Sequence, residues 1–298
     1  MKLKKRRGMY VEFRKNVREN QNLRDSFNQL AEDTFGIHFG QWYARGYWTE
    51  KYVPFSYIEG DRVIANVSVN LIDFTIAGEE KKAIQIGTVM THPDYRNRGL
   101  SKDLLMKVLD EYRDRVDFVY LFANQNVLEF YPKFGFRAQE ETLFTMVPGT
   151  AGEVSERKLD MEEKADRDLA YGIAKDRLPV STRFGTENTG ELFMFYALYA
   201  FPDNLYYLEE EDAVVMFQRD GERIDLYDVV CRENIDVRKI AEKLADDETR
   251  QIVFHFTPEE TEGMQADVFQ GDDVLFVLPM GSGAGIPDGV KHPLTAQA

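Results

Sequence analysis

The stretch that decides the fold is Lys82-Ala-Ile-Gln-Ile-Gly-Thr-Val-Met-Thr-His-Pro-Asp-Tyr-Arg-Asn-Arg-Gly-Leu-Ser-Lys-Asp-Leu-Leu105. Its first part, residues 83–90, is an apolar run of strand length and strand composition. Pro93 ends this strand, because proline cannot donate to a ladder and disfavours a helical residue before it. A helix follows, since apolar residues recur with a helical period at positions 100, 104, 105, 108, 109, 112 and 116. The sequence therefore predicts a strand, a tight turn and a helix.

The turn between this strand and this helix has the composition of an anion site. Backbone N–H groups in the first turn of a helix lack helical partners, and the helix dipole adds partial positive charge there. Gly99 leaves room for a diphosphate, and Ser101 is small and can donate a hydrogen bond. Three cations stand nearby in an otherwise acidic chain: Arg96, Arg98 and Lys102. An ordinary strand–helix turn is the alternative, and this stretch alone does not decide between the two.

A second stretch, residues 118–136, supports the anion site. An apolar strand at 118–123 is followed by Asn124 and then by Tyr131, with Gly135-Phe136 after it. Together, the two stretches resemble the GNAT family of acetyl-CoA-dependent N-acetyltransferases. The family signature Gln/Arg-x-x-Gly-x-Gly/Ala matches positions 96 to 101, with serine as the last small residue, and the family's Asn and Tyr-x-x-x-Gly-Phe match the second stretch. The resemblance covers roughly residues 10–147.

The resemblance implies an α/β fold with a mixed sheet, namely the GNAT acyl-CoA N-acyltransferase fold with helices on both faces. The predicted elements have that order: strand, two helices, three antiparallel strands, helix, strand, helix, strand. It also implies acetyl-CoA (coenzyme A) as co-substrate, no metal, and transfer of the acetyl group to a primary amine of a small molecule or peptide by direct attack in a ternary complex. The residues that the resemblance assigns to the cofactor are Val89, Met90, Thr91, Arg96, Asn97, Arg98, Gly99, Leu100, Ser101, Lys102, Asn124 and Tyr131.

Tyr131 is the catalytic residue that the resemblance implies, as the acid that protonates the departing thiolate. A buried aromatic residue with a satisfied hydroxyl is the alternative. The base is not identified, because the family often places a glutamate on the central strand and positions 84–88 here are Ile, Gln, Ile, Gly and Thr. Candidates are His38, Glu50, Asp73, His92 or a chain of water molecules.

Two other classes of function stay open at this point. A CoA-binding sensor or interaction protein without transferase activity would use the same cofactor residues. A nucleotide-binding α/β domain is disfavoured, because the chain has neither Gly-Lys-Ser/Thr nor Gly-x-Gly-x-x-Gly.

Residues 36–48 form a segment crowded with aromatic side chains, and in a GNAT-like fold this segment forms one wall of the acceptor site. We predict that His38, Trp42 and Arg45 belong to this substrate wall. A short amphipathic helix that covers the core is the alternative, and an apolar wall can serve both roles.

The length of 298 residues favours two domains, with a linker at residues 148–152. Residues 1–150 are the predicted catalytic unit, closed by a strand at 142–147. Residues 151–298 repeat the same order of elements as a second GNAT-like unit, closed by a hairpin of 266–270 and 274–278.

The second unit lacks the features of the anion site. Its corresponding turn has no glycine, and Glu233 and Asp236 would repel a diphosphate. We therefore predict that the second unit has no CoA site and is structural or covers the acceptor pocket of the first.

Composition limits the partners of the chain. The net charge of −15 argues against nucleic acid and against anionic membranes as partners, and the basic segment 2–7 is interpreted as a solvated end. A single cysteine, Cys231, fits a reducing compartment. No run reaches the roughly 18 apolar residues of a membrane span. We expect a cytoplasmic protein, and a homodimer is left open.

Overall fold

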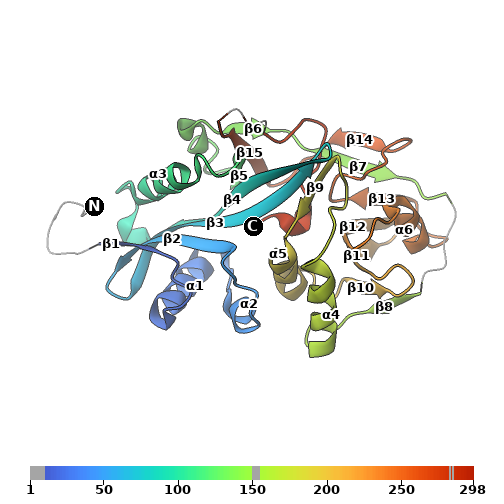
Figure 1. Ribbon diagram of the computed structural model, residues 1–298, viewed down its shortest axis with the longest axis horizontal. Helices are drawn as coiled ribbons and strands as arrows, with labels where there is room; N and C mark the ends of the chain where they lie inside the picture. The colour runs from blue at the N-terminus through green and yellow to red at the C-terminus, as the bar shows by residue number, and fades with distance from the viewer. Residues whose placement is uncertain (1–10, 150–154, 282, 284) are drawn as a thin grey trace.

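The computed structural model describes residues 11–149, 155–281, 283 and 285–298, arranged as two mixed sheets with helices packed on them (Figure 1). The basic segment 2–7 and residues 150–152 of the predicted linker lie outside the described residues.

The first sheet has the strand order β1-β2-β3-β4-β5-β15-β6, and β9 pairs with the far end of β3. Only β4 and β5 pair in parallel, and α3 (Leu100–Tyr112) connects them. The strands are β1 (Glu12–Lys15), β2 (Tyr52–Glu59), β3 (Arg62–Ile76), β4 (Glu79–Thr91), β5 (Phe118–Asn124), β6 (Arg137–Gln139), β9 (Phe184–Glu187) and β15 (Asp273–Pro279).

Helices cover both faces of this sheet, as the sequence predicts. Leu104 and Val108 of α3 pack on one face against Ile86. On the other face, α1 (Gln21–Phe35) and α2 (Gly40–Ala44) pack through Phe27 and Trp42. Alternation along β2 and β3 sends neighbouring side chains into the two separate cores, which is why both strands are apolar along most of their length.

The second sheet has the order β14-β7-β13-β12-β11-β10-β8 and repeats the pattern of the first. Here β12 and β13 are the parallel pair, and α6 (Val237–Leu244) connects them. This repeat is consistent with two GNAT-like units in tandem. The remaining elements are β7 (Thr142–Met146), β8 (Glu156–Lys158), β10 (Leu205–Leu208), β11 (Ala213–Asp220), β12 (Arg223–Val230), β13 (Gln251–Phe254), β14 (Gln265–Val268), α4 (Lys164–Ala174) and α5 (Gly190–Phe195), which continues into a π-helical turn (Tyr196–Ala200).

Two predictions about strand partners are wrong. The strand β7 does not close the first unit but pairs with β13 and β14 in the second sheet. The expected hairpin of β14 and β15 does not form, because β15 lies between β5 and β6 in the first sheet. Neighbouring residues of β15 enter two different cores, as is typical of an interior strand: Leu275 enters one core and Phe276 the other. All residues of β14, in contrast, are exposed. A division near residue 150 stays a prediction. The first sheet takes β9 and β15 from beyond that point, and the second sheet takes β7 from before it.

Residues 286–298, which we call the C-terminal segment, run between the two sheets. Its end lies in the middle of the molecule, between the first sheet and α5 (Figure 1). Lys291 forms a buried ion pair with Glu141 at 2.8 Å. His292 lies among aromatic rings, where burial lowers its pKa to about 3. Farther on, the Gln85 side chain donates to the Ala298 carbonyl at 2.9 Å.

The buried ion pair gives a prediction about stability. Lys291→Met leaves the Glu141 carboxylate buried without its partner, so the free energy of unfolding should fall by about 3–5 kcal/mol. The double variant Glu141→Leu, Lys291→Met should recover most of this loss, because it removes both charges. Denaturant unfolding measures both effects.

The control is Lys158→Met, which removes an exposed lysine paired with Asp203. Its effect should stay within about 1 kcal/mol. A loss at Lys291 no larger than that of the control would contradict the anchoring role of the buried pair.

Candidate active site

A cavity of about 760 Å³ opens where β4 and β5 separate. Their parallel pairing runs from Ala83 and Phe118 to Ile86 and Leu121 and stops there, although both strands continue. Residues 86–91 and 122–124 line the cavity beyond that point. Backbone groups of two separated strands therefore face a space in which a ligand can bind to them.

A bulge at Thr88 causes this separation. Thr88 has a φ of +47°, which is strained for a β-branched residue, and the register of β3 against β4 shifts beside it. The buried Asn66 carboxamide donates to the Thr88 carbonyl at 3.0 Å and to Ser68 Oγ at 2.8 Å, and it accepts from Ser56 Oγ at 2.8 Å. The Tyr52 and Thr88 hydroxyls lie 2.7 Å apart. Side-chain hydrogen bonds thus replace ladder bonds and hold the bulge.

The N-terminus of α3 faces the same cavity. Gly99 has a φ of +77°, and no described side chain caps the helix there. The first helical bond runs from the Asp103 amide to the Gly99 carbonyl at 3.0 Å, so the preceding amides of Leu100, Ser101 and Lys102 have no helical acceptor. A Cβ atom on Gly99 would meet no heavy atom within 4 Å, which shows open space in front of these donors.

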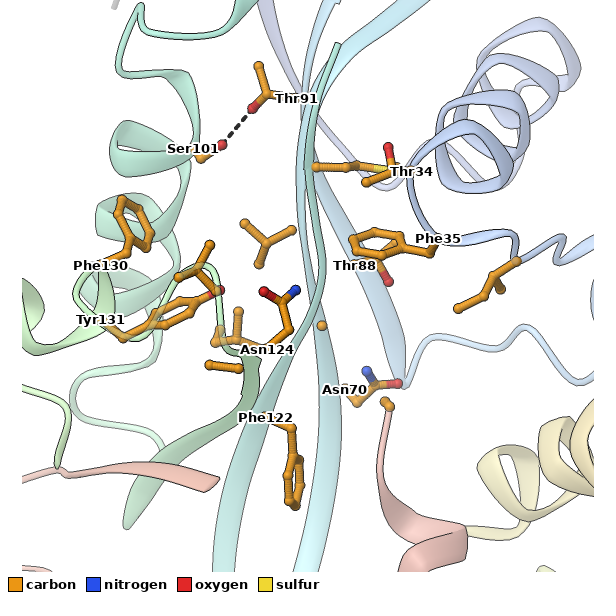
Figure 2. Close-up of a pocket in the computed structure, with 18 of the residues that line it drawn as sticks. Thr34, Phe35, Asn70, Thr88, Thr91, Ser101, Phe122, Asn124, Phe130 and Tyr131 are labelled. Atoms are coloured by element: carbon orange, nitrogen blue, oxygen red, sulfur yellow. Dashed lines mark hydrogen bonds between the residues drawn. The ribbon is translucent and has the colours of Figure 1, made fainter. Parts of the chain in front are cut away.

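Cations and hydroxyls surround this helix start. Arg96, Arg98 and Lys102 line the cavity, and Arg96 Nε donates to the Thr91 carbonyl at 3.2 Å. The hydroxyls of Thr91 and Ser101 lie 2.6 Å apart and tie the end of β4 to α3 (Figure 2). The helix dipole, the amides and the cations together favour a bound anion with several negative charges.

Tyr131 and Asn124 approach the cavity from the other strand. Figure 2 shows both side chains directed into the space between α3 and the central strands. The Tyr131 ring packs on Phe276 of the exchanged strand β15, and its burial raises the pKa of the hydroxyl to about 12. Tyr131 is therefore a proton donor at neutral pH. Asn124 Oδ1 accepts from the Asn126 amide at 3.0 Å, which orients its carboxamide.

The predicted substrate wall is only partly at the cavity. Trp42 lines it, and its indole donates to the Glu191 carbonyl of α5 at 2.7 Å. His38 and Arg45 are not among the lining residues: His38 accepts from the Gly40 amide, and Arg45 donates to Met161 and Glu162 of the second unit.

The remaining base candidates are also engaged elsewhere. Glu50 is paired with Arg18, and Asp73 accepts from the Asn188 side chain. His92 contacts the Arg62 guanidinium. None of the three lines the cavity.

Sequence reasoning missed the lining residues that come from other elements. Asn70 and Phe122 belong to strands of the first sheet. Five more residues come from α5, the π-helical turn after it and the C-terminal segment: Leu192, Phe195, Tyr196, Gln297 and Ala298. Nothing local in the sequence connects these positions to the turn at Gly99, since the tertiary packing alone brings them together.

In the second unit, the place that corresponds to the cavity of the first unit is filled by side chains and by the C-terminal segment. Asp236 caps α6 by accepting from the Lys239 amide at 3.1 Å. Parallel pairing of β12 and β13 ends at Leu226 and Phe254, and the C-terminal segment enters beyond it. There the Leu294 amide donates to the His255 carbonyl at 3.0 Å, and Thr295 bonds to the buried Asp228. These contacts support the prediction that the second unit has no CoA site.

The described residues include neither a long apolar helix nor a cluster of metal-ligand side chains. No helix in them has the length and apolar character needed to cross a membrane. They also contain no group of three or more His, Cys, Asp or Glu side chains suited to a metal ion.

Comparison with known proteins agrees with the expected family. Residues 18–138 match the model of an acetyltransferase (GNAT) domain. No curated protein sequence matches the chain.

Similar solved structures share the fold over most of the chain, both units included. A probable N-acyltransferase from Enterococcus faecalis has a TM-score of 0.58 at 11% identity and covers 92% of this chain and 73% of its own. Eis1 from Mycobacterium abscessus has a TM-score of 0.57 at 12% identity, with 89% and 73% covered. A GCN5-related N-acetyltransferase from Kribbella flavida has a TM-score of 0.54 at 15% identity, with 90% and 71% covered.

The open helix start gives a prediction about ligand affinity. Gly99→Val places a branched side chain in the space in front of the free amides, so the affinity for CoA should fall at least about tenfold. Isothermal titration calorimetry measures the affinity, and circular dichroism checks that the fold is intact.

Gly221→Val is the matched control. Gly221 also has a positive φ, of +56°, and open space around it, but it lies in the β11–β12 turn away from the cavity. The control should bind CoA as the wild type does. Equal affinities of the two variants would rule out the diphosphate site.

Proposed function

We propose that this chain, whose residues 18–138 form a GNAT acetyltransferase domain, transfers an acetyl group from acetyl-CoA to a primary amine of a small molecule or peptide. The observation that supports this most is that the uncapped start of α3, the unpaired backbone of β4 and the Tyr131 hydroxyl face one cavity. Each of the three provides one requirement of the reaction: a diphosphate site, a thioester site and a proton donor.

The cofactor would lie along the split between β4 and β5. Its diphosphate would accept from the amides of residues 100–102, with Arg96, Arg98 and Lys102 compensating the charge. Its pantetheine arm would pass between the strands and pair with the backbone of residues 89–91. The bulge at Thr88 makes that backbone available, because it turns the strand away from its neighbour.

The reaction would proceed by direct attack in a ternary complex. The neutral amine forms the new C–N bond to the thioester carbonyl carbon, and the C–S bond breaks. Backbone N–H groups of β4 stabilise the developing oxyanion. The thiolate takes the Tyr131 proton, and the amine's proton passes to water in the cavity, from which Tyr131 recovers its own. A water path supplies the base, because the described lining holds no histidine and Asp273 is its one acidic side chain.

A CoA-binding sensor or interaction protein without transferase activity is the second candidate. A different observation favours it: the described lining holds no histidine or glutamate that could take the amine's proton directly. Release of free thiol from acetyl-CoA in the presence of a panel of amines discriminates the two functions.

The tyrosine gives a prediction about turnover. Tyr131→Phe removes the proton donor but keeps the ring packing, so kcat should fall about 100-fold while CoA affinity changes little. Burial holds the pKa near 12, so the wild-type hydroxyl stays protonated, and titration of Tyr131 should cause no loss of rate between about pH 7 and 10. Steady-state kinetics and calorimetry measure the two quantities.

Tyr112→Phe is the control, since Tyr112 is a buried residue of α3 that does not line the cavity. Its kcat should match that of the wild type. An unchanged kcat in Tyr131→Phe would remove this residue from the mechanism.

A further inference from the structure

Large apolar side chains line the part of the cavity on the α1–α2 side of the sheet. We call this part the apolar chamber and define it by Phe35, Ile37, Phe39, Trp42, Tyr52 and Met90. Figure 2 shows Thr34 and Phe35 across the central strands from Phe130 and Tyr131, so the cavity passes from one side of the sheet to the other. A group bound between β4 and β5 therefore has direct access to the apolar chamber.

The walls of the apolar chamber are held in place by the core behind them. The Phe39 ring stacks on Tyr52 with 5.5 Å between ring centroids and lies 5.6 Å from Phe27 of α1. The Trp42 ring lies 6.1 Å from the ring of Trp48. Apart from Phe35, all the residues that define the chamber belong to this core cluster or pack against it. Close-packed side chains keep their positions, so the chamber is formed before a ligand enters.

The polar groups of these walls are directed to the protein. The Trp42 indole donates to the Glu191 carbonyl at 2.7 Å, and the Tyr52 hydroxyl lies 2.7 Å from that of Thr88. The Thr34 hydroxyl, next to Phe35, donates to the Leu30 carbonyl at 2.7 Å. The chamber thus presents mainly ring and alkyl surface to a ligand, and such a surface favours an apolar group.

Phe35 is the exposed member of this set. The residue is 42% exposed, although it is large and apolar, and it lines the cavity. α1 ends at Phe35, and Gly36 follows with a φ of +70°. Figure 2 shows the Phe35 ring directed from the end of α1 toward the bulge at Thr88. An alkyl group in the chamber would cover this ring and remove apolar surface from water.

A different part of the cavity carries the polar groups that an amine needs. A Cβ atom added at Gly87 would stand 3.3 Å from the Ala298 carbonyl oxygen and 3.6 Å from Asn70 Nδ2. This Asn70 nitrogen is buried and has no hydrogen-bond partner among the described residues. The acceptor amine is better matched to these groups than to the apolar chamber, which leaves the chamber to another part of the complex.

The position of the thioester decides which group reaches the apolar chamber. In the proposed complex the thioester carbonyl lies at the backbone of residues 89–91, and the Met90 side chain lines the chamber. The alkyl part of the acyl group therefore extends from the place where the chamber begins. An acetyl group fills little of a cavity of about 760 Å³, a volume that is typical of sites for larger small molecules.

We infer that this chain also transfers linear acyl groups longer than acetyl, such as butanoyl and hexanoyl, and that the apolar chamber binds their alkyl chains. The inference rests on the proposed function and broadens its donor. The bonds are the same as for acetyl: the amine nitrogen bonds to the carbonyl carbon, the C–S bond breaks, and the thiolate takes the Tyr131 proton. Only the alkyl group on the carbonyl carbon differs.

Affinity measured against chain length tests the binding step without an amine. Each methylene group that moves from water into an apolar site should lower the Kd about fourfold, so butanoyl-CoA should bind at least about tenfold more tightly than acetyl-CoA. Titration calorimetry with acetyl-CoA, butanoyl-CoA and hexanoyl-CoA measures this. A gain of less than about threefold from acetyl to butanoyl, or a loss, would overturn the inference.

Tryptophan emission shows where the alkyl chain binds. The chain has two tryptophans, Trp42 in the wall of the chamber and Trp48 beside it, so emission reports on the apolar chamber. Hexanoyl-CoA should cause a saturable change in emission that is clearly larger than the change caused by CoA. Identical changes with the two ligands would contradict binding of the alkyl chain in the chamber.

Phe35→Ala tests the wall at an exposed position. The variant should bind acetyl-CoA nearly as the wild type does, whereas the advantage of hexanoyl-CoA over acetyl-CoA should fall at least about threefold. Phe13→Ala is the matched control, because Phe13 is 38% exposed on β1 and does not line the cavity. The control should keep the full advantage. An equal reduction in both variants, or in neither, would overturn the role of Phe35.

Transfer is tested with an amine that the protein acetylates. Butanoyl-CoA should release free thiol in the presence of this amine, and release no faster than without it would overturn the transfer of longer acyl groups. CoA itself separates the two levels of the account. A protein that binds CoA and gains nothing from a longer acyl chain contradicts the inference alone, whereas absence of CoA binding contradicts the proposed function.

Discussion

The hydrogen bonds that hold the bulge at Thr88 are the constraint on which the site depends. Asn66 supplies the bond that a regular ladder would give to the Thr88 carbonyl, and Tyr52 bonds to the Thr88 hydroxyl. A buried carboxamide without these partners would be costly, so the network specifies one geometry of the strand. Because β4 turns there, its backbone leaves β5, and the cavity opens in front of α3 and Tyr131.

The second unit contributes residues to the site of the first unit. In the second unit itself, the corresponding place is filled by the C-terminal segment. Its strand β15 lies beside β5 and packs on Tyr131, while β7 of the first half lies in the second sheet. The C-terminal segment fills the gap beyond the parallel pair of the second sheet and then reaches the cavity of the first. The two similar sheets therefore differ at the place where their parallel strands separate. Leu192 and Phe195 of α5 give the second unit a part in the wall of this cavity.

The sequence predicts local structure well and spatial partners poorly. The strand at 83–90, the turn at Gly99 and the helix after it follow from periodicity and turn chemistry, and the GNAT domain is confirmed by the family match. The prediction of a hairpin of β14 and β15 was wrong. Alternation and a Gly-Asp-Asp turn indicate extended strands, but they do not determine which strands pair with each other. Neither Asn70 nor Phe195 has a local signature: Asn70 is one of many buried residues of β3, and packing between the units places Phe195 at the cavity. His38 and Arg45 were chosen for their chemistry, whereas the residues of that segment that line the cavity are Ile37, Phe39 and Trp42.

The most direct test is diffraction from crystals soaked with CoA. The account predicts one CoA per chain, with its diphosphate on the amides of residues 100–102 and its pantetheine arm between β4 and β5. Density for the cofactor in the second sheet, or a soaked crystal in which the start of α3 is empty or covered by a side chain, would contradict it.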